Sequence, residues 1–292
     1  MPELPEVETI VRGLKQRIIG RKIKKIWTDW RKYLRASGGE NALRKCVIRK
    51  KILKIERRGK NILFSLSDDC MLLVHQKITG HLLFGKWKSV NGKWLSLKSG
   101  PLREDKINQY LRLILFFDNN EALGLSDVRR LAKVRFGPTQ TIISLPEIKG
   151  LGPEPLEPTF YYKNFKALFN NKRGRIKPVL MDQDFISGIG NIYADEALWL
   201  ARIHPLSRAE KLNEAQLKRL YASIKRILKK ALALHGSSID NYRDVSGRRG
   251  GYDVVRYAYQ RTGEPCPRCK QPIKRIVVGG RSAHFCPKCQ RH

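Results

Sequence analysis

The chain has 292 residues, a length that predicts about two domains. Apolar residues make up 41% and aromatic residues 9%, which suffices for buried cores and excludes a wholly disordered chain. The 59 lysines and arginines against 26 aspartates and glutamates give a net charge of +33, and this excess indicates a polyanionic partner. Nucleic acid is the first candidate, because each neutralised phosphate releases counterions; an anionic membrane surface is the competitor.

The sequence argues against a membrane protein. The apolar run Leu111–Phe117 is interrupted at Arg112 and is far shorter than the ~20 residues of a spanning helix. Residues Met1–Glu6 are acidic and lack the apolar core of a secretion signal. We therefore expect a cytoplasmic protein that does not bind membranes. Of its six cysteines, Cys46 and Cys70 lie outside the cluster near the C-terminus and are expected as buried, small apolar residues.

Periodicity predicts a helix followed by many short strands. Apolar residues recur at helical spacing over residues 6–19, between Pro5 and Gly20. From residue 21 to about 138, short runs of Ile, Leu, Val and Phe alternate with turn residues such as Asn91–Gly92, which predicts a β-sandwich or barrel. The expected strands include Lys50–Ile55, Ile62–Leu66, Met71–Val74, Leu111–Phe117 and Leu123–Leu125.

The second half of the chain is predicted to be mainly helical. Four prolines and two glycines in residues 144–158 indicate a linker. Asn213 is expected to cap a long helix that runs to His235, and Ser207–Glu210 has the form of a capping box. Residues 237–260 are rich in Gly, Arg and Tyr and are expected to form a mobile loop.

The last 32 residues carry the strongest motif. Two Cys-x₂-Cys pairs are separated by 16 residues, a spacing that predicts one tetrahedral Zn²⁺. Four protein ligands leave the metal no open position, so the zinc is expected to be structural. Residues 261–292 hold eight basic residues and one acidic residue, which favours contact with phosphates; a solvated charged face stays open as the alternative. The expected ligands are Cys266, Cys269, Cys286 and Cys289.

The N-terminus carries a second chemical signal. Met1 precedes the small residue Pro2, so we expect Met1 to be removed and a secondary amine to be exposed. Such an amine can attack a sugar carbon and form an iminium ion. Glu3 and Glu6 lie within reach as proton donor and orienting carboxylate. Ordinary capping of a helix accounts for the same proline and acidic residues, and this alternative stays open.

At this point the residues resemble a known family. Met1–Thr9 resembles the N-terminal signature of the formamidopyrimidine-DNA glycosylases, bifunctional base-excision repair enzymes that are also described as 8-oxoguanine DNA glycosylase/AP lyases. The signature and the four-cysteine finger occur together in this chain, and the pair is specific to the family. The resemblance continues at Arg57–Lys60, Leu151–Leu156, Lys177–Gln183 and Gly188–Glu196.

The resemblance implies an α+β fold. An N-terminal helix and a β-sandwich would span residues 1–138, and a linker, 139–158, would lead to a helix–two-turn–helix domain at 159–260. A zinc-finger β-hairpin would follow at 261–292. Residues 237–260 would form the loop that recognises the damaged base. We expect a monomer that binds damaged double-stranded DNA between its lobes, at the nucleoid of a bacterial-type cell.

The resemblance also implies residue roles. Pro2 would attack C1′ of the damaged nucleotide, Glu3 would protonate the ring oxygen and Glu6 would be the supporting carboxylate. Lys60 matches the lysine assigned to β-elimination, and Arg281 matches the finger arginine linked to δ-elimination. Asn191 also follows a glycine loop at a helix start, where backbone N–H groups favour a phosphate, although a plain helix–helix turn has the same pattern. The implied DNA contacts are His75, Ile78, Tyr110, Arg129, Leu131, Lys172, Arg173 and Asn191.

The chain departs from the family pattern where side chains fill the space left by the extruded base. Asp127–Ala132 supplies Arg129 but has Leu131 where Phe is usual. His75–Gly80 has Ile78 in place of Met and Lys77 in place of Gly. A Leu or Ile side chain can still intercalate, so these departures leave the lesion range and the opposite-base preference open.

Three functions follow as hypotheses. The first is a glycosylase that removes 8-oxoguanine and formamidopyrimidines through a Schiff base on Pro2 and then cuts the strand by β,δ-elimination. The second is an endonuclease VIII-like enzyme for oxidised pyrimidines, for which Ile78 and Leu131 leave room. The third is a non-catalytic zinc-finger protein that binds damaged DNA. Pro2, Glu3 and Lys60 argue for an enzyme.

Overall fold

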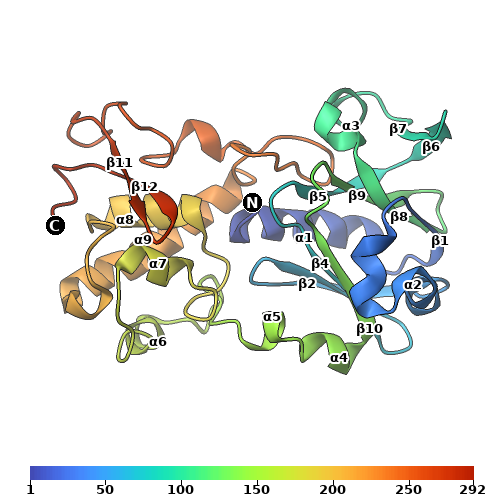
Figure 1. Ribbon diagram of the computed structural model, residues 1–292, viewed down its shortest axis with the longest axis horizontal. Helices are drawn as coiled ribbons and strands as arrows, with labels where there is room; N and C mark the ends of the chain where they lie inside the picture. The colour runs from blue at the N-terminus through green and yellow to red at the C-terminus, as the bar shows by residue number, and fades with distance from the viewer. The chain divides into compact units, whose positions relative to one another are not determined.

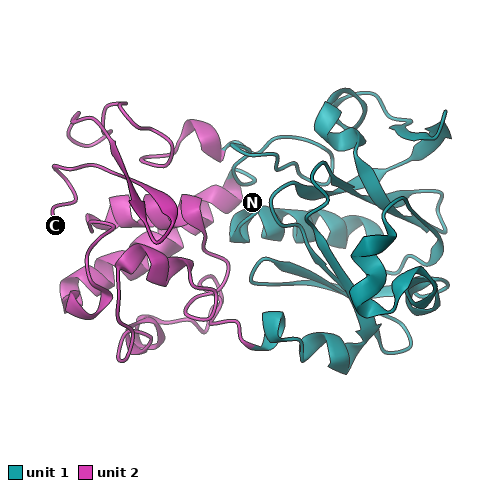
Figure 2. Cartoon of the chain, in the orientation of Figure 1, with its two compact units in different colours: residues 1–149, 234–251 teal, residues 150–233, 252–292 magenta.

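The computed structural model describes residues 1–292, which form two compact units (Figure 2). Unit 1 comprises residues 1–149 and 234–251, and unit 2 comprises residues 150–233 and 252–292. The chain therefore returns to unit 1 for 18 residues before it completes unit 2. The predicted α+β class is confirmed, since strands dominate unit 1 and helices dominate unit 2 (Figure 1).

Unit 1 is a β-sandwich of two antiparallel four-stranded sheets, as predicted. The first sheet has the order β1 (Ile23–Thr28), β8 (Leu111–Phe117), β9 (Ala122–Asp127) and β5 (Gly80–Gly85). The second has the order β10 (Lys133–Pro138), β4 (Cys70–His75), β3 (Asn61–Leu66) and β2 (Ile52–Arg58). Apolar residues of both sheets meet in one core.

Helix α1 (Leu4–Ile18) completes this core. Val7, Ile10 and Leu14 are fully buried and belong to the same apolar cluster as residues of β1 and β2, so α1 packs on the sandwich (Figure 1). Pro5 lies in the first turn, where a backbone N–H has no partner within the helix, so its absence removes no helical hydrogen bond. The helix thereby fixes the start of the chain on a rigid body.

Short elements join the strands. Asn91–Gly92 forms a turn, as predicted, and closes the hairpin of β6 (Trp87–Val90) and β7 (Lys93–Ser96). Two helices, α4 (Thr139–Ile143) and α5 (Pro146–Lys149), lie inside the expected linker segment. The remaining elements of unit 1 are η1 (Arg31–Ser37), α2 (Gly39–Val47), α3 (Pro101–Glu104) and η2 (Lys106–Gln109).

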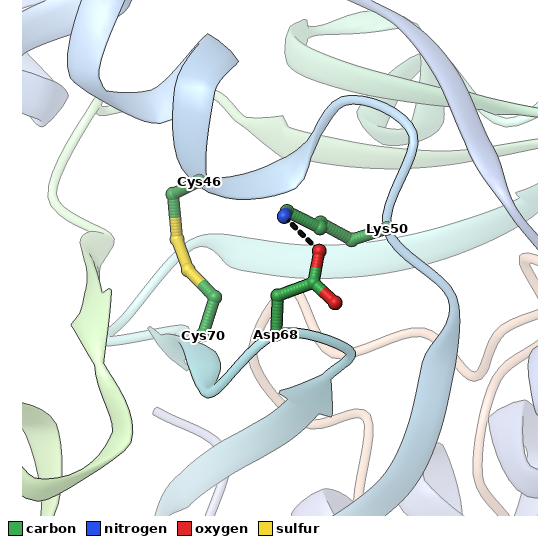
Figure 3. Close-up of a disulfide and its surroundings, with 4 residues drawn as sticks. All are labelled: Cys46, Lys50, Asp68 and Cys70. Atoms are coloured by element: carbon green, nitrogen blue, oxygen red, sulfur yellow. Dashed lines mark hydrogen bonds and ion pairs between the residues drawn. A yellow bond between two sulfur atoms is a disulfide. The ribbon is translucent and has the colours of Figure 1, made fainter.

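A disulfide joins Cys46 to Cys70 (Figure 3). The expectation that they are separate apolar residues is wrong. Packing of α2 beside β4 brings their Cα atoms to 6.0 Å, within the usual disulfide range, although 24 residues separate them in the sequence. An ion pair between Lys50 and Asp68 links the same two segments. The separation of Cys46 and Cys70 along the sequence did not indicate that they lie close together in space.

Unit 2 is built around the helix pair α8 (Asn191–Ala201) and α9 (Glu214–Ala233). One apolar stripe of α9 is buried, whereas α8 is buried on nearly all sides. The remaining elements are α6 (Tyr162–Ala167), α7 (Ile176–Met181), η3 (Ala209–Lys211), η4 (Tyr252–Val254), β11 (Lys274–Val278) and β12 (Arg281–Phe285). No helix combines the length and the apolar character needed to cross a membrane.

Of the two capping predictions near the start of α9, one is confirmed and one is wrong. Asn213 does cap the helix: its Oδ1 accepts from Gln216 N at 2.9 Å, and Gln216 Oε1 accepts from Asn213 N at 2.9 Å. The capping box expected at Ser207–Glu210 is wrong, because the Glu210 carboxylate accepts from Gly174 N and Arg208 instead. The helix ends at Ala233, two residues before the predicted end.

Candidate active site and nucleic-acid interface

Two buried carboxylates stand at the start of α1, directly after Pro2. Glu3 is the N-cap residue, and its backbone N–H donates to Glu6 Oε2 at 2.7 Å. Glu6 Oε1 accepts from the backbone N–H of Ser237 at 2.8 Å. Backbone donors at a helix N-terminus stabilise a carboxylate, so Glu6 is fixed from two sides. Pro2 is itself buried at this position.

Sequence reasoning did not link the helix α1 to residues 236–240. Gly236 has φ +83°, and a Cβ there would lie 2.6 Å from Glu6 Oε1, so the position requires glycine for both reasons. The N-terminal ammonium of Met1 pairs with Asp240 Oδ2 at 2.7 Å. An acidic residue therefore lies next to the chain start.

Lys60 lies in the turn between β2 and β3 and is only 5% exposed. Arg57 braces this turn: its Nε donates to Glu8 Oε2 at 3.1 Å, and its Nη1 donates to Gly59 O at 3.1 Å. Since Glu8 belongs to α1, the arginine ties the helix that carries the N-terminus to the turn that carries Lys60. The structure thus anchors both expected reactive amines on one body.

His75 ends β4 at the same end of the sheet, where it pairs with Asn61. Burial, followed by the charges of Lys77 and Lys60, lowers the pKa of His75 to about 3. The ring is therefore neutral near pH 7. Its Nδ1 accepts from Lys77 N at 3.0 Å, so the proton resides on Nε2. A neutral donor beside a lysine suits contact with a phosphate oxygen.

The loops that carry Ile78 and Arg129 are joined through one buried carboxylate. Asp127, which is fully buried, accepts from Thr79 Oγ1 and from Ala132 N, the latter at 2.8 Å. Thr79 Oγ1 in turn accepts from Arg129 N at 3.2 Å. The two loops predicted to fill the space of an extruded base are therefore held against each other.

These loops present apolar side chains to solvent. Ile78 is 43% exposed and Leu131 is 38% exposed. Tyr110, also exposed, is placed beside them, because Asp127 N donates to Tyr110 O at 2.9 Å. Lys77 adopts φ 55°, so the family's usual glycine at this position is replaced by a residue in the left-handed region. The exposed side chains fit insertion between bases.

In unit 2, Asn191 opens α8 beside a polar pocket of about 340 Å³. The buried Asn191 Oδ1 has no hydrogen-bond partner. The pocket also contains donors that sequence reasoning missed, although Arg275 lay in the basic run of the finger and Tyr259 in the Tyr-rich segment. The donors suit a phosphate. The other lining residues are Gln260, Thr262, Ser282 and His284.

The remaining predicted basic contacts lie elsewhere in unit 2. Arg281 begins β12 and is exposed at the hairpin turn. Lys172 and Arg173 line a different pocket of about 600 Å³ together with Arg208. Lys172 Nζ pairs with Asp182 Oδ2 at 2.6 Å, so its charge is partly neutralised within the unit. The structure does not bring these two residues to the pocket of Asn191.

A buried ionic network joins the finger hairpin to the helices. Lys177 Nζ donates to Asp195 Oδ1 at 2.6 Å and also to the carbonyl oxygen of Ser282. Asp195 Oδ2 accepts from the backbone N–H of His284 at 2.8 Å. All three polar side chains, those of Lys177, Asp195 and His284, are buried. The network positions β12 against α7 and α8.

The four finger cysteines form a metal centre. All four Sγ atoms lie within 4.8 Å of one another, which fits the ~3.8 Å S···S separation of a tetrahedral site with Zn–S bonds of about 2.3 Å. Although burial opposes it, backbone N–H groups of Cys269 and Arg268 lower the pKa of Cys266 to about 7. Burial raises the pKa of the Cys286 and Cys289 thiols, so a bound metal ion would be what stabilises their thiolate forms. The residues fit one structural Zn²⁺, as predicted.

A proline-led helix on a β-sandwich, followed by two helices joined by a double turn and by a four-cysteine finger, is the architecture of one class of base-excision DNA glycosylases. Family models agree along the chain. Residues 1–134 match the formamidopyrimidine-DNA glycosylase N-terminal domain, and 151–243 match the formamidopyrimidine-DNA glycosylase H2TH domain. Residues 263–291 match the zinc finger found in FPG and IleRS. The chain belongs to the formamidopyrimidine-DNA glycosylase family.

Curated relatives match over the full chain. The formamidopyrimidine-DNA glycosylase of Ligilactobacillus salivarius is 37% identical over 290 residues, which cover 99% of each chain. That of Chloroflexus aurantiacus is 38% identical and covers 99% of this chain and 98% of its own. The family and the glycosylase activity of base-excision repair predicted from the sequence are therefore confirmed.

Solved structures match equally well. The Lactococcus lactis enzyme in complex with DNA that contains an abasic site superposes with a TM-score of 0.84 at 36% identity, over 99% of this chain and all of that one. A structure of MutM with DNA containing carbocyclic 8-oxo-G has a TM-score of 0.84 at 36% identity, with full coverage of both chains. The L. lactis enzyme with an oxidised pyrimidine in DNA has a TM-score of 0.84 at 35% identity, also with full coverage.

Proposed function

We propose that this glycosylase removes oxidised purines, 8-oxoguanine and formamidopyrimidines, from double-stranded DNA and then cuts the strand at the abasic site. One observation carries the proposal: Pro2 directly precedes two buried carboxylates, that of the N-cap residue Glu3 and that of Glu6 in the first turn of α1. The names of the relatives and the 8-oxo-G in a matching structure support purine lesions. The abasic DNA in another supports the lyase step.

The chemistry requires a free amine on Pro2. After removal of Met1, the Pro2 nitrogen forms a bond to C1′ as the bond from C1′ to the base breaks, and Glu3 protonates the ring oxygen as the sugar opens. The resulting iminium ion acidifies the C2′ proton. Loss of that proton expels the 3′ phosphate, and a second elimination expels the 5′ phosphate. Lys60 assists the first elimination and Arg281 the second.

Glu6 is assigned a positioning role. Both of its oxygens already accept backbone N–H groups, from Glu3 and Ser237, so it is suited to hold geometry rather than to transfer a proton. In the DNA complex, Ile78, Arg129 and Leu131 occupy the space of the extruded base. The basic and polar contacts to the DNA are His75, Tyr110, Lys172, Arg173 and Asn191.

The functional division we propose is residues 1–138 for the amine and the sandwich, 139–158 for the linker, 159–260 for the helix–two-turn–helix with its recognition loop, and 261–292 for the finger. The protein acts as a monomer on damaged DNA and works beside the chromosome in the cytoplasm. The bacterial origin of the relatives supports this location.

A second substrate class is oxidised pyrimidines. The L. lactis enzyme has been solved with an oxidised pyrimidine in its DNA. In this chain, Ile78 and Leu131 replace the usual wedge residues, which alters the space beside the opposite base. Excision of 8-oxoguanine opposite cytosine, compared with that of thymine glycol, separates the two classes.

Borohydride trapping tests the proposed nucleophile. Protein shown by intact mass to lack Met1 is incubated with 8-oxoguanine DNA in the presence of borohydride, which reduces the iminium ion to a stable protein–DNA adduct. The same protein with Met1 retained is the control and should give no adduct. Equal adduct yields from both forms would remove Pro2 as the nucleophile.

A further inference from the structure

Residues 242–248, in the loop expected to be mobile, are held against the rest of unit 1 by specific contacts. Arg243, only 4% exposed, donates from Nε to Asp105 Oδ2 at 2.6 Å and from Nη1 to Tyr242 O at 2.8 Å. A charged side chain is buried only where it is paired, so Arg243 fixes the loop to Asp105. Asp105 lies between α3 and η2, 138 residues away in the sequence.

Asn108 forms a second connection to the loop. It is 1% exposed, and its Nδ2 donates to Pro101 O at 2.7 Å and to Gly247 O at 3.2 Å. Its Oδ1 accepts from His81 Nε2 at 3.0 Å. The amide therefore uses both of its donors and its acceptor to join η2, β5 and the loop. A Cβ at Gly247 would lie 2.6 Å from Asn108 Nδ2, so this approach requires glycine.

The same loop residues also contact the sandwich. Phe84 N, in β5, donates to Val245 O at 2.7 Å, and the Val245 side chain is buried beside Gly13 of α1. Within the loop, Asp244 Oδ1 accepts from Ser246 N at 2.8 Å and from Arg248 N at 2.9 Å. These bonds make a defined turn that leaves the Arg248 side chain exposed.

We propose that residues 101–109, through Asp105 and Asn108, hold the recognition loop in the conformation that accepts a damaged base. Asp105 and Asn108 are positioning residues, because they act through Arg243 and Gly247 and not on the substrate. This inference rests on the proposed function, which assigns the loop to base recognition. We call the contacts of Asp105 and Asn108 with the loop the loop anchor. Loss of the loop anchor should slow base excision and leave the cutting of a preformed abasic site unchanged, since that substrate has no base.

The test compares two reactions in single-turnover experiments. Asp105→Asn removes the ion pair with Arg243, and Asn108→Ala removes the amide that bonds Gly247 and His81. Each variant should therefore slow 8-oxoguanine excision about tenfold. Cutting at a preformed abasic site should stay within about twofold of the unaltered protein. Glu104→Gln is the matched control: it makes the same change from acid to amide one residue earlier, at an exposed side chain that accepts from Gly100 N.

Hydrogen exchange gives a readout that is independent of catalysis. Amides 244–250 should exchange faster in Asp105→Asn and Asn108→Ala and at the original rate in Glu104→Gln. The Arg243→Gln variant should match Asp105→Asn, and the double variant should be no worse than either single one, because both remove the same ion pair.

Two results would overturn the proposed role of the loop anchor. One is an unchanged hydrogen-exchange rate of amides 244–250 in the variants, and the other is an equal loss in the rates of base excision and of abasic-site cutting. If the unaltered protein cuts abasic DNA but does not excise 8-oxoguanine, the purine assignment fails. The exchange experiment then still decides the role of the loop anchor by itself.

Discussion

The hydroxyl of Tyr33 donates a hydrogen bond of 2.6 Å to Oδ2 of Asp127, although the two residues are 94 positions apart in the sequence. Burial, followed by the hydrogen bond to Asp127, raises the pKa of Tyr33, so the phenol stays protonated as a donor. Asp127 also accepts from Thr79 and Ala132. The tyrosine in η1 thus donates to the carboxylate that joins the loop carrying Ile78 to the loop carrying Arg129.

Tyr33→Phe should lower the free energy of unfolding by about 2 kcal/mol, because a buried carboxylate loses one of its donors. Urea denaturation measures the change. Tyr162→Phe is the control: its hydroxyl bonds the exposed carboxylate of Glu214, so its loss should cost much less. A loss for Tyr33→Phe no larger than that of the control would show that Asp127 is held without the tyrosine.

The disulfide between Cys46 and Cys70 predicts a redox-dependent stability. It closes a 24-residue separation, for which loop entropy gives about 3 kcal/mol. Reductant should therefore lower the midpoint of urea unfolding. The double variant Cys46→Ser, Cys70→Ser should start at the lower midpoint and should not respond to mild reductant. Thiol titration of the denatured, unreduced protein should find four thiols, and six would contradict the bond.

Patterns with a short period were predictable from the sequence. Burial of Val7, Ile10 and Leu14 on α1 follows from a 3.6-residue repeat, and the cysteine module follows from fixed ligand spacing. The family signature pointed to Pro2 and Lys60 because these residues lie in contiguous motifs. In each case the information lay within about twenty residues of sequence.

Relationships between distant segments were not predictable. The disulfide, the Tyr33–Asp127 bond and the Arg243–Asp105 pair each join residues whose proximity depends on how the sheets and loops pack. Capping at Ser207–Glu210 failed for a related reason, since the Glu210 carboxylate is taken by Gly174 from another loop. A single amino-acid sequence has no periodic pattern that indicates contacts between segments far apart along the chain.

The zinc centre predicts a spectroscopic signal. Trp199 packs in the same apolar cluster as Cys266 and Cys286, stacks on Tyr257 at 4.5 Å, and has the Arg268 guanidinium 4.2 Å from its ring centroid. Removal of zinc by a chelator should release the finger and change the fluorescence of Trp199. Trp199→Phe should abolish that change, and metal analysis should give one zinc per chain. Purified protein that is folded and cuts abasic DNA with no bound metal would contradict a structural zinc.

His81 predicts how stability depends on pH. Its ring is fully buried, and burial lowers its pKa to about 4, from an ordinary value of 6.5. Between these two values the unfolded chain binds a proton that the folded protein does not. Stability is therefore complete above pH 6.5 and falls by about 1.4 kcal/mol per pH unit as the pH drops toward 4.

His81→Gln isolates this contribution. Glutamine does not titrate, and its amide can still donate to Asn108 Oδ1, which accepts from His81 Nε2 at 3.0 Å. Burial also lowers the pKa of His75, to about 3, but His75 is present in both proteins, so its contribution cancels in the comparison. The stability advantage of the unaltered protein over the variant should shrink by roughly 3 kcal/mol between pH 7 and pH 4. A difference that stays constant over this range would mean that His81 takes up its proton in the folded protein as readily as in the unfolded chain.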